Sequence, residues 1–267
     1  EWAFTAFLGD PYPPHRKRLP GSAVTMQQHR QVGPVPGGQG DLPVDAAITA
    51  IDQQVAVLAP ASTKAIAWDD NLENADMAWL IDNRKLGNVI GEQAAKWINE
   101  KLGGKAEVAI LNYPQLPILL ERGNGIKEAI TKGAPNAKIV AETSAINPAE
   151  GISKMETIFQ ANPDVKVIGS IGGGGSVGAN EAAKAGNKIT DDFGIFAADA
   201  TQPELLAIKN NEGVRMSVTI TGTNKVIAEK VAAMVEQLAS GKPIEKKEVY
   251  REMIPVTKEN VDEYLNK

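Results

Sequence analysis

Polar side chains and one glycine loop follow six apolar segments of this sequence, at the points where the segments end. The six positions are Asp69, Asn112, Thr143, Gly172, Asp199 and Thr221. Carboxylates accept hydrogen bonds, whereas guanidinium groups donate them, and a molecule rich in hydroxyls needs both kinds of partner. If the apolar segments are parallel strands, their carboxyl ends share one edge of a sheet, where such sheets bind ligands. The pattern predicts a cleft for a hydroxyl-rich small molecule.

The clearest pattern lies between residues 165 and 201. Residues 165–171 are apolar, 172–175 are four glycines, and 179–185 are small residues with good helix propensity. A second apolar run, 193–198, ends on Asp199. A strand, a helix and a strand of these lengths form a βαβ unit, whose strands are parallel and whose crossover is right-handed. The glycines and Asp199 are therefore expected at one edge.

The same glycines allow a second interpretation, an NAD-dependent oxidoreductase. Gly173, Gly175 and Gly178 fit the pattern G-x-G-x-x-G, and Asp199 ends the next strand 21 residues later, where a ribose partner would lie. Against it, the motif lies late in the chain, and no His, Cys or Ser with a base partner supplies substrate chemistry. The segment also lacks the lysine of a phosphate-binding P-loop.

Composition limits the available chemistry. The 267 residues include no cysteine, which excludes disulfides and thiolate catalysis. The two histidines, His15 and His29, do not form a metal-binding spacing. The formal charge of -5 argues against nucleic acid, and no apolar run is long enough to span a membrane. We therefore expect no metal, no cofactor, no nucleic-acid partner and no membrane insertion.

From residue 64 onward, strand-like and helix-like segments alternate, which predicts an α/β fold whose parallel sheets are covered on both faces. Residues 1–44 are rich in Pro and Gly and read as loop or disorder, and residues 45–60 fit a helix and a strand equally well. The expected helices lie within residues 81–104, 117–133, 151–163, 203–213 and 226–241, with a short last helix capped by Thr257.

From about Asp69 onward, the sequence resembles the periplasmic sugar-binding proteins of bacterial ABC transporters, of the ribose-binding type. The resemblance covers roughly three quarters of the chain, and its strength lies in the shared order of several segments. They are WDDN at 68–71, IDNRKLGNVIGEQAA at 81–95, LLERGNGIKEAI at 119–130, ANPDVKVIGSI and SVGANEA at 161–171 and 176–182, FAADATQPELLAI at 196–208 and VTKENVDEYL at 256–265.

The resemblance implies two Rossmann-like lobes joined by a three-crossing hinge, with the ligand in the cleft between the lobes. The N-terminal lobe would comprise residues 1–86 and 222–249, with 1–44 atypical, and the C-terminal lobe residues 87–221 and 250–267. The crossings are expected near residues 84–88, 220–224 and 248–254. Hinge closure would exclude water and strengthen polar contacts to the ligand.

The resemblance also implies a binding site. Asp69 and Asp199 match sugar-binding aspartates, and Arg122 matches an arginine that binds sugar hydroxyls. Asn83 and Asn112 are further candidates, with turn residues as the alternative. An aromatic ring would stack on the sugar, and Tyr113, Trp68 and Trp79 are available, although Trp68 also fits a core position.

Four positions depart from the family pattern. Gly172 and Gly173 replace an Asn-Asp pair, Ile146 replaces an aromatic residue, and Thr221 replaces a glutamine of the last crossing strand. Gly172, Gly173 and Thr221 remain expected ligand contacts, the glycines through backbone. The added room favours a larger sugar, a deoxysugar or a sugar alcohol over a plain pentose. The usual first strand is not visible, and the region before Asp69 is about 20 residues short.

The expected function is capture of a monosaccharide or sugar alcohol, without catalysis, by a periplasmic monomer that delivers it to the permease of an ABC importer. The chain begins at Glu1 without a methionine or signal peptide, as expected for an exported, processed protein or a trimmed sequence. Besides the oxidoreductase, two alternatives share the cleft. One is a sugar sensor for a chemoreceptor, and the other is the effector domain of a repressor, for which residues 1–44 offer no helix-turn-helix.

Overall fold

The computed structural model describes residues 4–8, 24–28, 64–244 and 247–265. The chain divides into two compact units. The N-terminal unit comprises Glu1–Ile81 and Ala228–Arg251, and the C-terminal unit comprises Asp82–Ile227 and Glu252–Lys267. The chain therefore passes between the units three times, after residues 81, 227 and 251. Residues 45–60 and both histidines lie outside the described residues.

The N-terminal unit contains a five-stranded sheet with the order β10-β4-β3-β1-β2. Its strands are β1 (Phe4–Leu8), β2 (Val24–Gln28), β3 (Lys64–Asp69), β4 (Met77–Leu80) and β10 (Glu248–Tyr250). β3 is parallel to β4, and β4 to β10, whereas β1 is antiparallel to both β2 and β3. Helix α7 (Asn224–Ala239) belongs mostly to this unit and buries Met234 and Leu238.

Two predictions for this unit are wrong. Residues 1–44 contain two strands where loop or disorder was expected, and those strands make the sheet mixed rather than parallel. The strand β4 is not anticipated from the sequence at all. All four of its residues are buried, so it lacks the alternation that marks a half-buried strand.

The C-terminal unit contains a six-stranded sheet with the order β11-β9-β8-β7-β5-β6. Its strands are β5 (Glu107–Asn112), β6 (Lys138–Ser144), β7 (Val165–Ser170), β8 (Gly194–Ala198), β9 (Val214–Ile220) and β11 (Met253–Val256). The first five are parallel, as predicted, and β11 joins β9 antiparallel. The carboxyl ends of the parallel strands therefore share one edge of this sheet.

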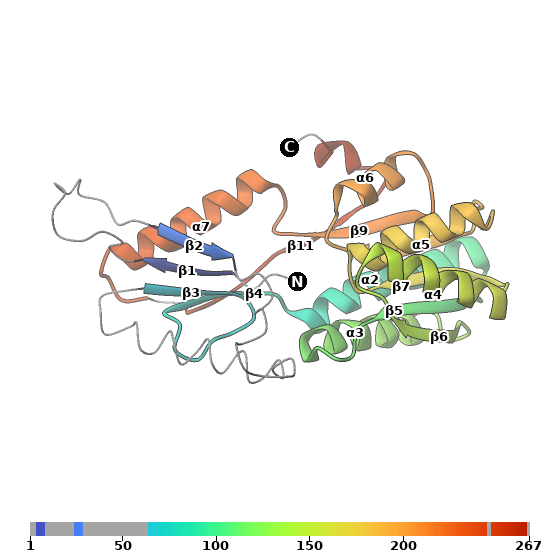
Figure 1. Cartoon of the computed structure of the whole chain (residues 1–267), viewed down its shortest axis with the longest axis horizontal. Helices are drawn as coiled ribbons and strands as arrows, with labels where there is room; N and C mark the ends of the chain where they lie inside the picture. Colours follow the sequence, from blue (N-terminus) through green and yellow to red (C-terminus); the bar gives the residue numbers. More distant parts are fainter. Residues whose placement is uncertain (1–3, 9–23, 29–63, 245–246, 266–267) are drawn as a thin grey trace, which may run out of the picture. The chain divides into compact units, whose positions relative to one another are not determined.

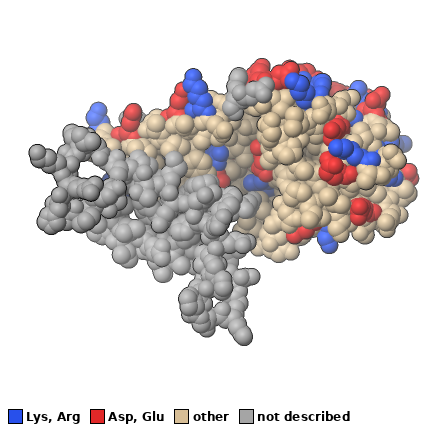
Figure 2. Space-filling view, turned by 45° about the horizontal axis from the view of Figure 1, so that its top comes forward, with Lys and Arg blue, Asp and Glu red and all other residues tan. Residues whose placement is uncertain are grey.

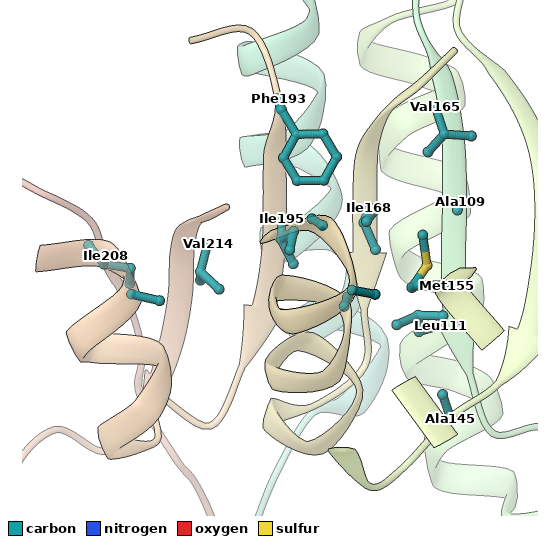
Figure 3. Packing of buried hydrophobic residues seen from close by; sticks show 14 of the residues in the cluster. Ala109, Leu111, Ala145, Met155, Val165, Ile168, Phe193, Ile195, Ile208 and Val214 are labelled. Carbon is teal, nitrogen blue, oxygen red and sulfur yellow. The ribbon is translucent and has the colours of Figure 1, made fainter. Parts of the chain in front are cut away.

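Helices cover both faces of this sheet (Figure 1). They are α2 (Asn83–Leu102), α3 (Pro117–Gly133), α4 (Pro148–Ala161), α5 (Gly173–Ala185) and α6 (Gln202–Lys209), with a 3₁₀ turn, η2 (Val261–Glu263). α2 and α3 contact each other on one face. On the other face, α4, α5 and α6 enclose an apolar core that includes Leu111, Met155, Ile168 and Ile195 (Figure 3).

The expected glycine loop is largely helix. Gly172 is the N-cap of α5, and the helix begins at Gly173 rather than at Ala179. A methyl group on Gly174 would collide with the carbonyl oxygen of Ile146, and one on Gly178 with that of Pro148. These glycines let α5 approach the start of α4 closely, which explains their number without a phosphate ligand.

The end of the chain differs from the expected last helix. Asn260, not Thr257, is the N-cap residue of the turn η2, and the Asn260 side chain accepts a hydrogen bond from the backbone N–H of Thr257. Before it, Pro255 lies in the edge strand β11 opposite Val218. A proline is tolerated there because an edge strand need not donate every backbone hydrogen bond.

On the face shown in Figure 2, basic and acidic side chains of the described residues are interspersed. Within the described part of the chain, no helix combines the length and apolarity needed to cross a membrane.

Candidate sugar-binding site

Three predicted ligand residues have an unusual backbone conformation. Asp69 is the last residue of β3, and Asp199 and Thr221 directly follow β8 and β9; their φ angles are 69°, 91° and 77°. Positive φ is uncommon outside glycine and is a genuine outlier for a β-branched residue such as Thr. Such conformations cost about 1–3 kcal/mol each and gather at ligand sites. The strain therefore favours a functional role for these strand ends.

Asp199 lies at the N-terminus of helix α5. Its exposed side chain accepts a hydrogen bond from the N–H of Gly173, with 2.8 Å between Oδ2 and N. The helix dipole stabilises a carboxylate at this end. A methyl group on Gly172 would lie 2.9 Å from the same oxygen, so Asp199 can occupy this position only because residue 172 has no side chain.

Arg122 lies beside the same loop. It is 5% exposed, and its Nε and Nη2 donate to Oδ1 of Asn83 at 3.0 and 2.7 Å. Its Nη1 donates to the carbonyl oxygen of Ile171 at 2.7 Å. These contacts use three of the five N–H groups of a guanidinium. The structure thus brings Asn83, Arg122, Gly172, Gly173 and Asp199 together in one hydrogen-bonded series.

Asn112 is placed differently. It is fully buried, its Nδ2 donates to Oε1 of Glu142 at 2.7 Å, and its Oδ1 accepts the N–H of Tyr113 at 2.8 Å. Burial acts to raise the pKa of Glu142, but hydrogen bonds from Asn112 and Lys127 lower it below its usual value. These contacts give Asn112 a structural role, in which it fixes the end of β5 and the start of the segment that carries Tyr113.

Thr221 is buried, and its backbone N–H donates to the carbonyl oxygen of Glu252 at 2.7 Å. It follows β9, which pairs with β8 through Ala198 and Val218. Thr221 and Asp199 therefore follow neighbouring strands at the same edge of the C-terminal sheet. Thr221 also lies close in sequence to the second passage between the units.

Asp69 is the one predicted ligand residue of the N-terminal unit. Its carboxylate forms an ion pair with Arg251, whose side chain is only 8% exposed. The Arg251 guanidinium also lies 5.1 Å from the ring of Trp68 and 4.8 Å from that of Trp79. Burial lowers the pKa of Arg251, and the charge of Asp69 opposes this change.

Two aspects of this cluster were not predicted. Arg251 is 182 residues away from Asp69 in the sequence and belongs to no motif. Trp79, a candidate for stacking on a sugar, is 1% exposed and packs edge-on against Trp68 with 4.7 Å between ring centroids. The ring of Trp79 is therefore part of the core and is not a stacking surface.

The geometry disfavours the dinucleotide interpretation. In that interpretation a pyrophosphate would accept hydrogen bonds from the N-terminus of α5. The N–H of Gly173 already donates to the carboxylate of Asp199, whose charge would repel a phosphate. Among the described residues, no three His, Cys, Asp or Glu side chains form a group that could hold a metal.

The family described as periplasmic binding protein domain matches residues 42–243. The chain belongs to this family.

Known relatives and solved structures agree with this assignment. The ABC transporter periplasmic-binding protein YphF of Escherichia coli is 25% identical over 172 residues, which is 63% of this chain and 52% of that protein. The ribose import binding protein RbsB of Bacillus subtilis is 27% identical over 158 residues, 58% of this chain and 49% of that protein. The matched part thus spans about half the length of these relatives.

A periplasmic solute-binding protein of an ABC transporter from Actinobacillus succinogenes, solved with bound D-allose, shares the fold. Its TM-score is 0.68 at 20% identity, over 80% of this chain and 76% of that one. The family and fold therefore favour a binding protein over an oxidoreductase.

Proposed function

We propose that this chain is an extracytoplasmic solute-binding protein that captures a monosaccharide or a sugar alcohol and delivers it to the permease of an ABC importer. The family and the names of its relatives support transport, and the polar series at the C-terminal sheet edge supports a hydroxylated ligand. The chain acts as a binding protein without catalysing a reaction. A chemoreceptor would use the same site, and a transport assay distinguishes the two.

The proposal rests on one observation, a hydrogen-bond acceptor (Asp199) and a hydrogen-bond donor (Arg122) that both contact the segment around Gly172. The Arg122 guanidinium donates a hydrogen bond to the carbonyl oxygen of Ile171, and the Asp199 carboxylate accepts one from the N–H of Gly173. A carboxylate accepts from adjacent hydroxyls while an arginine donates to the same or a neighbouring oxygen, and such charge-assisted bonds are about twice as strong as neutral ones.

The size of the ligand follows from the residues that are small here. Ile146, which replaces an expected aromatic ring, is 43% exposed. The space beside Gly172 and Gly173 is taken by Asp199, Thr201 and Glu204 and adds no room. We expect the ligand to be larger than a pentose, or to carry fewer hydroxyls than the family site can satisfy.

The predicted lobes, 1–86 with 222–249 and 87–221 with 250–267, and ligand capture between them stay predictions. In this proposal Asp69 and Asn83 contribute from the N-terminal lobe, and Arg122, Asp199 and Thr221 contribute from the C-terminal lobe. The protein acts as a monomer.

The first test is titration calorimetry and thermal shift with D-allose, D-ribose, myo-inositol and NAD(H). Binding of one sugar or polyol raises the melting temperature by mass action. Asp199→Ala should weaken that binding about 100-fold, the scale of losing two charge-assisted hydrogen bonds. Asp192→Ala is the matched control, because Asp192 precedes the same strand β8 and pairs with Lys166.

Arg122→Lys keeps the positive charge but loses the double hydrogen bond to Asn83, so it should also weaken sugar binding. A response to NAD(H) alone would overturn the proposal. Equal affinity in wild type and Asp199→Ala would show that the site lies elsewhere.

A further inference from the structure

Behind Asp199 lies a carboxylate that the proposed site does not use. Glu204, in the first turn of α6, is 0% exposed. A fully buried carboxylate is rare unless it is hydrogen-bonded or paired, because desolvation of its charge is costly. Glu204 therefore needs a specific reason to be there.

Four contacts surround the Glu204 carboxylate. Oε1 accepts from the hydroxyls of Ser176 at 2.6 Å and Ser217 at 3.1 Å. Oε2 accepts from the backbone N–H and the hydroxyl of Thr201, both at 2.8 Å. The partners come from three places, namely α5, β9 and the turn that follows Asp199.

Glu204 and its partner Ser217 hold the two residues that follow Asp199. Ser217 Oγ also accepts the N–H of Ala200 at 2.9 Å, so the turn is bound at Ala200 and at Thr201. Asp199 and Ala200 both have positive φ, 91° and 45°, a conformation that needs such external support. On the other side, Ser176 lies within one turn of Gly173, whose N–H binds Asp199.

The charges of Glu204 and Asp199 act on each other. Burial and, to a smaller extent, the charge of Asp199 raise the pKa of Glu204 to about 7, although the hydrogen bonds from Ser176 and Thr201 oppose this rise. Glu204 also borders a hollow of about 240 Å³. The other charged residues that line this hollow are Glu181 and Lys184 on α5 and Glu212 after α6.

We propose that Glu204 is a positioning residue whose proton sets the conformation of the Asp199 turn. An ionised Glu204 repels the Asp199 carboxylate, whereas a protonated one does not. The hydroxyls of Ser217 and Thr201 can rotate to accept a hydrogen bond from the protonated Glu204 carboxyl, so the network survives protonation.

A consequence for the ligand rests on the proposed function. A sugar that covers Asp199 removes water and strengthens the repulsion between the two carboxylates. Capture should therefore be accompanied by uptake of about half a proton by Glu204 near neutral pH, and affinity should be about fivefold higher at pH 6 than at pH 8.

The decisive experiment begins without any ligand. The amide signals of Gly173 and Ala200 are followed by NMR between pH 5 and 8.5 in wild type, Glu204→Gln and Glu212→Gln. We expect a transition with a midpoint near 7 in wild type that is absent from Glu204→Gln. Glu212→Gln keeps the transition, because Glu212 binds Asn180 and Lys184 instead of the Asp199 turn. No transition, or the same transition in Glu204→Gln, would overturn the proposal.

D-allose then serves as the probe of the ligand effect. Glu204→Gln mimics the protonated residue, so its affinity should equal that of wild type at pH 6 and not change with pH. Glu204→Ala, which loses all four contacts, should bind weakly at every pH. A purely structural role predicts instead that both variants lose affinity equally at both pH values. If the NMR transition depends on Glu204 but D-allose does not bind, Glu204 keeps its role and the proposed function fails for this sugar.

Discussion

Gly172 and Asp199 constrain each other at the level of single residues. The carboxylate of Asp199 occupies the space that a side chain at residue 172 would need. A side chain at residue 172 would therefore require the Asp199 carboxylate to move.

Gly172→Ala should displace the Asp199 carboxylate and weaken sugar binding at least tenfold, about 1.4 kcal/mol, with little effect on folding. Titration calorimetry measures the affinity and thermal unfolding the stability. Gly186→Ala, at the far end of α5, is the control, because its methyl group approaches no atom closer than 3.3 Å. Unchanged affinity in Gly172→Ala would mean that Asp199 does not bind the ligand in this position.

The sequence predicted some of these residues and missed others for a physical reason. Asp199 and Arg122 stand in segments whose order matches a family, so they could be named. Arg251 pairs with Asp69, which lies 182 residues away in the sequence, and no local sequence pattern reveals such a pair. Glu204 did leave a signal, because Thr201 and Glu204 form the T-x-x-E capping box that starts α6. That pattern predicts a helix start but not a buried carboxylate.

At the level of elements, α5 depends on its close approach to the segment that enters α4. Gly174 faces the carbonyl oxygen of Ile146, and Gly178 faces that of Pro148. Since these neighbours are backbone, they cannot rotate away as a side chain would.

Gly174→Ala should therefore destabilise the C-terminal unit by about 2 kcal/mol or more, in contrast to the usual gain from alanine in a helix. Urea unfolding at pH 7 measures the change, with Gly186→Ala again as the control. Equal stability of the two variants would contradict the close packing of α4 and α5.

The buried Glu204 network should also affect the pH dependence of stability. The pKa of Glu204 is about 7 in the folded state against 4.5 as the reference, so the folded state binds more protons between these values. The contribution of Glu204 to the free energy of unfolding is then fully present below pH 4.5 and is lost as the pH rises through 7.

Wild type should lose on the order of 3 kcal/mol relative to Glu204→Gln between pH 4.5 and 8. The measurement is the difference in free energy of unfolding between the two proteins across this range. Because both proteins contain the other carboxylates, the difference cancels their effects on stability. One of them is Asp192, whose pKa is lowered and which therefore changes stability only below about pH 4. A constant difference would show that Glu204 titrates normally.

The elements themselves were largely predictable from sequence periodicity, with instructive exceptions. α2 was predicted because Ile90, Ala94 and Ile98 mark one buried stripe and Gly103 ends it with φ of 61°. β4 was missed because its residues are buried on both faces, and β1 because its pairing with β3 joins distant parts of the chain. Strand pairing of that kind is a property of tertiary structure, and composition alone does not show it.

At the level of the whole molecule, both units carry a strained strand end with a carboxylate, Asp69 in one and Asp199 in the other. If one ligand uses both, its binding should slow amide hydrogen exchange at residues 69–71 and at residues 172–176 and 199–201 together. Exchange measured by mass spectrometry with and without saturating sugar tests this. Protection confined to the C-terminal unit would exclude a role for Asp69, and Asp69→Ala would then leave the affinity unchanged.

The edge strand β11 has a further consequence, for behaviour at high concentration. An exposed sheet edge invites intermolecular strand addition. β11 is four residues long and includes Pro255, which has no N–H to offer an incoming strand. At this edge of the sheet, β11 is therefore a poor partner for strand addition by another copy of the chain.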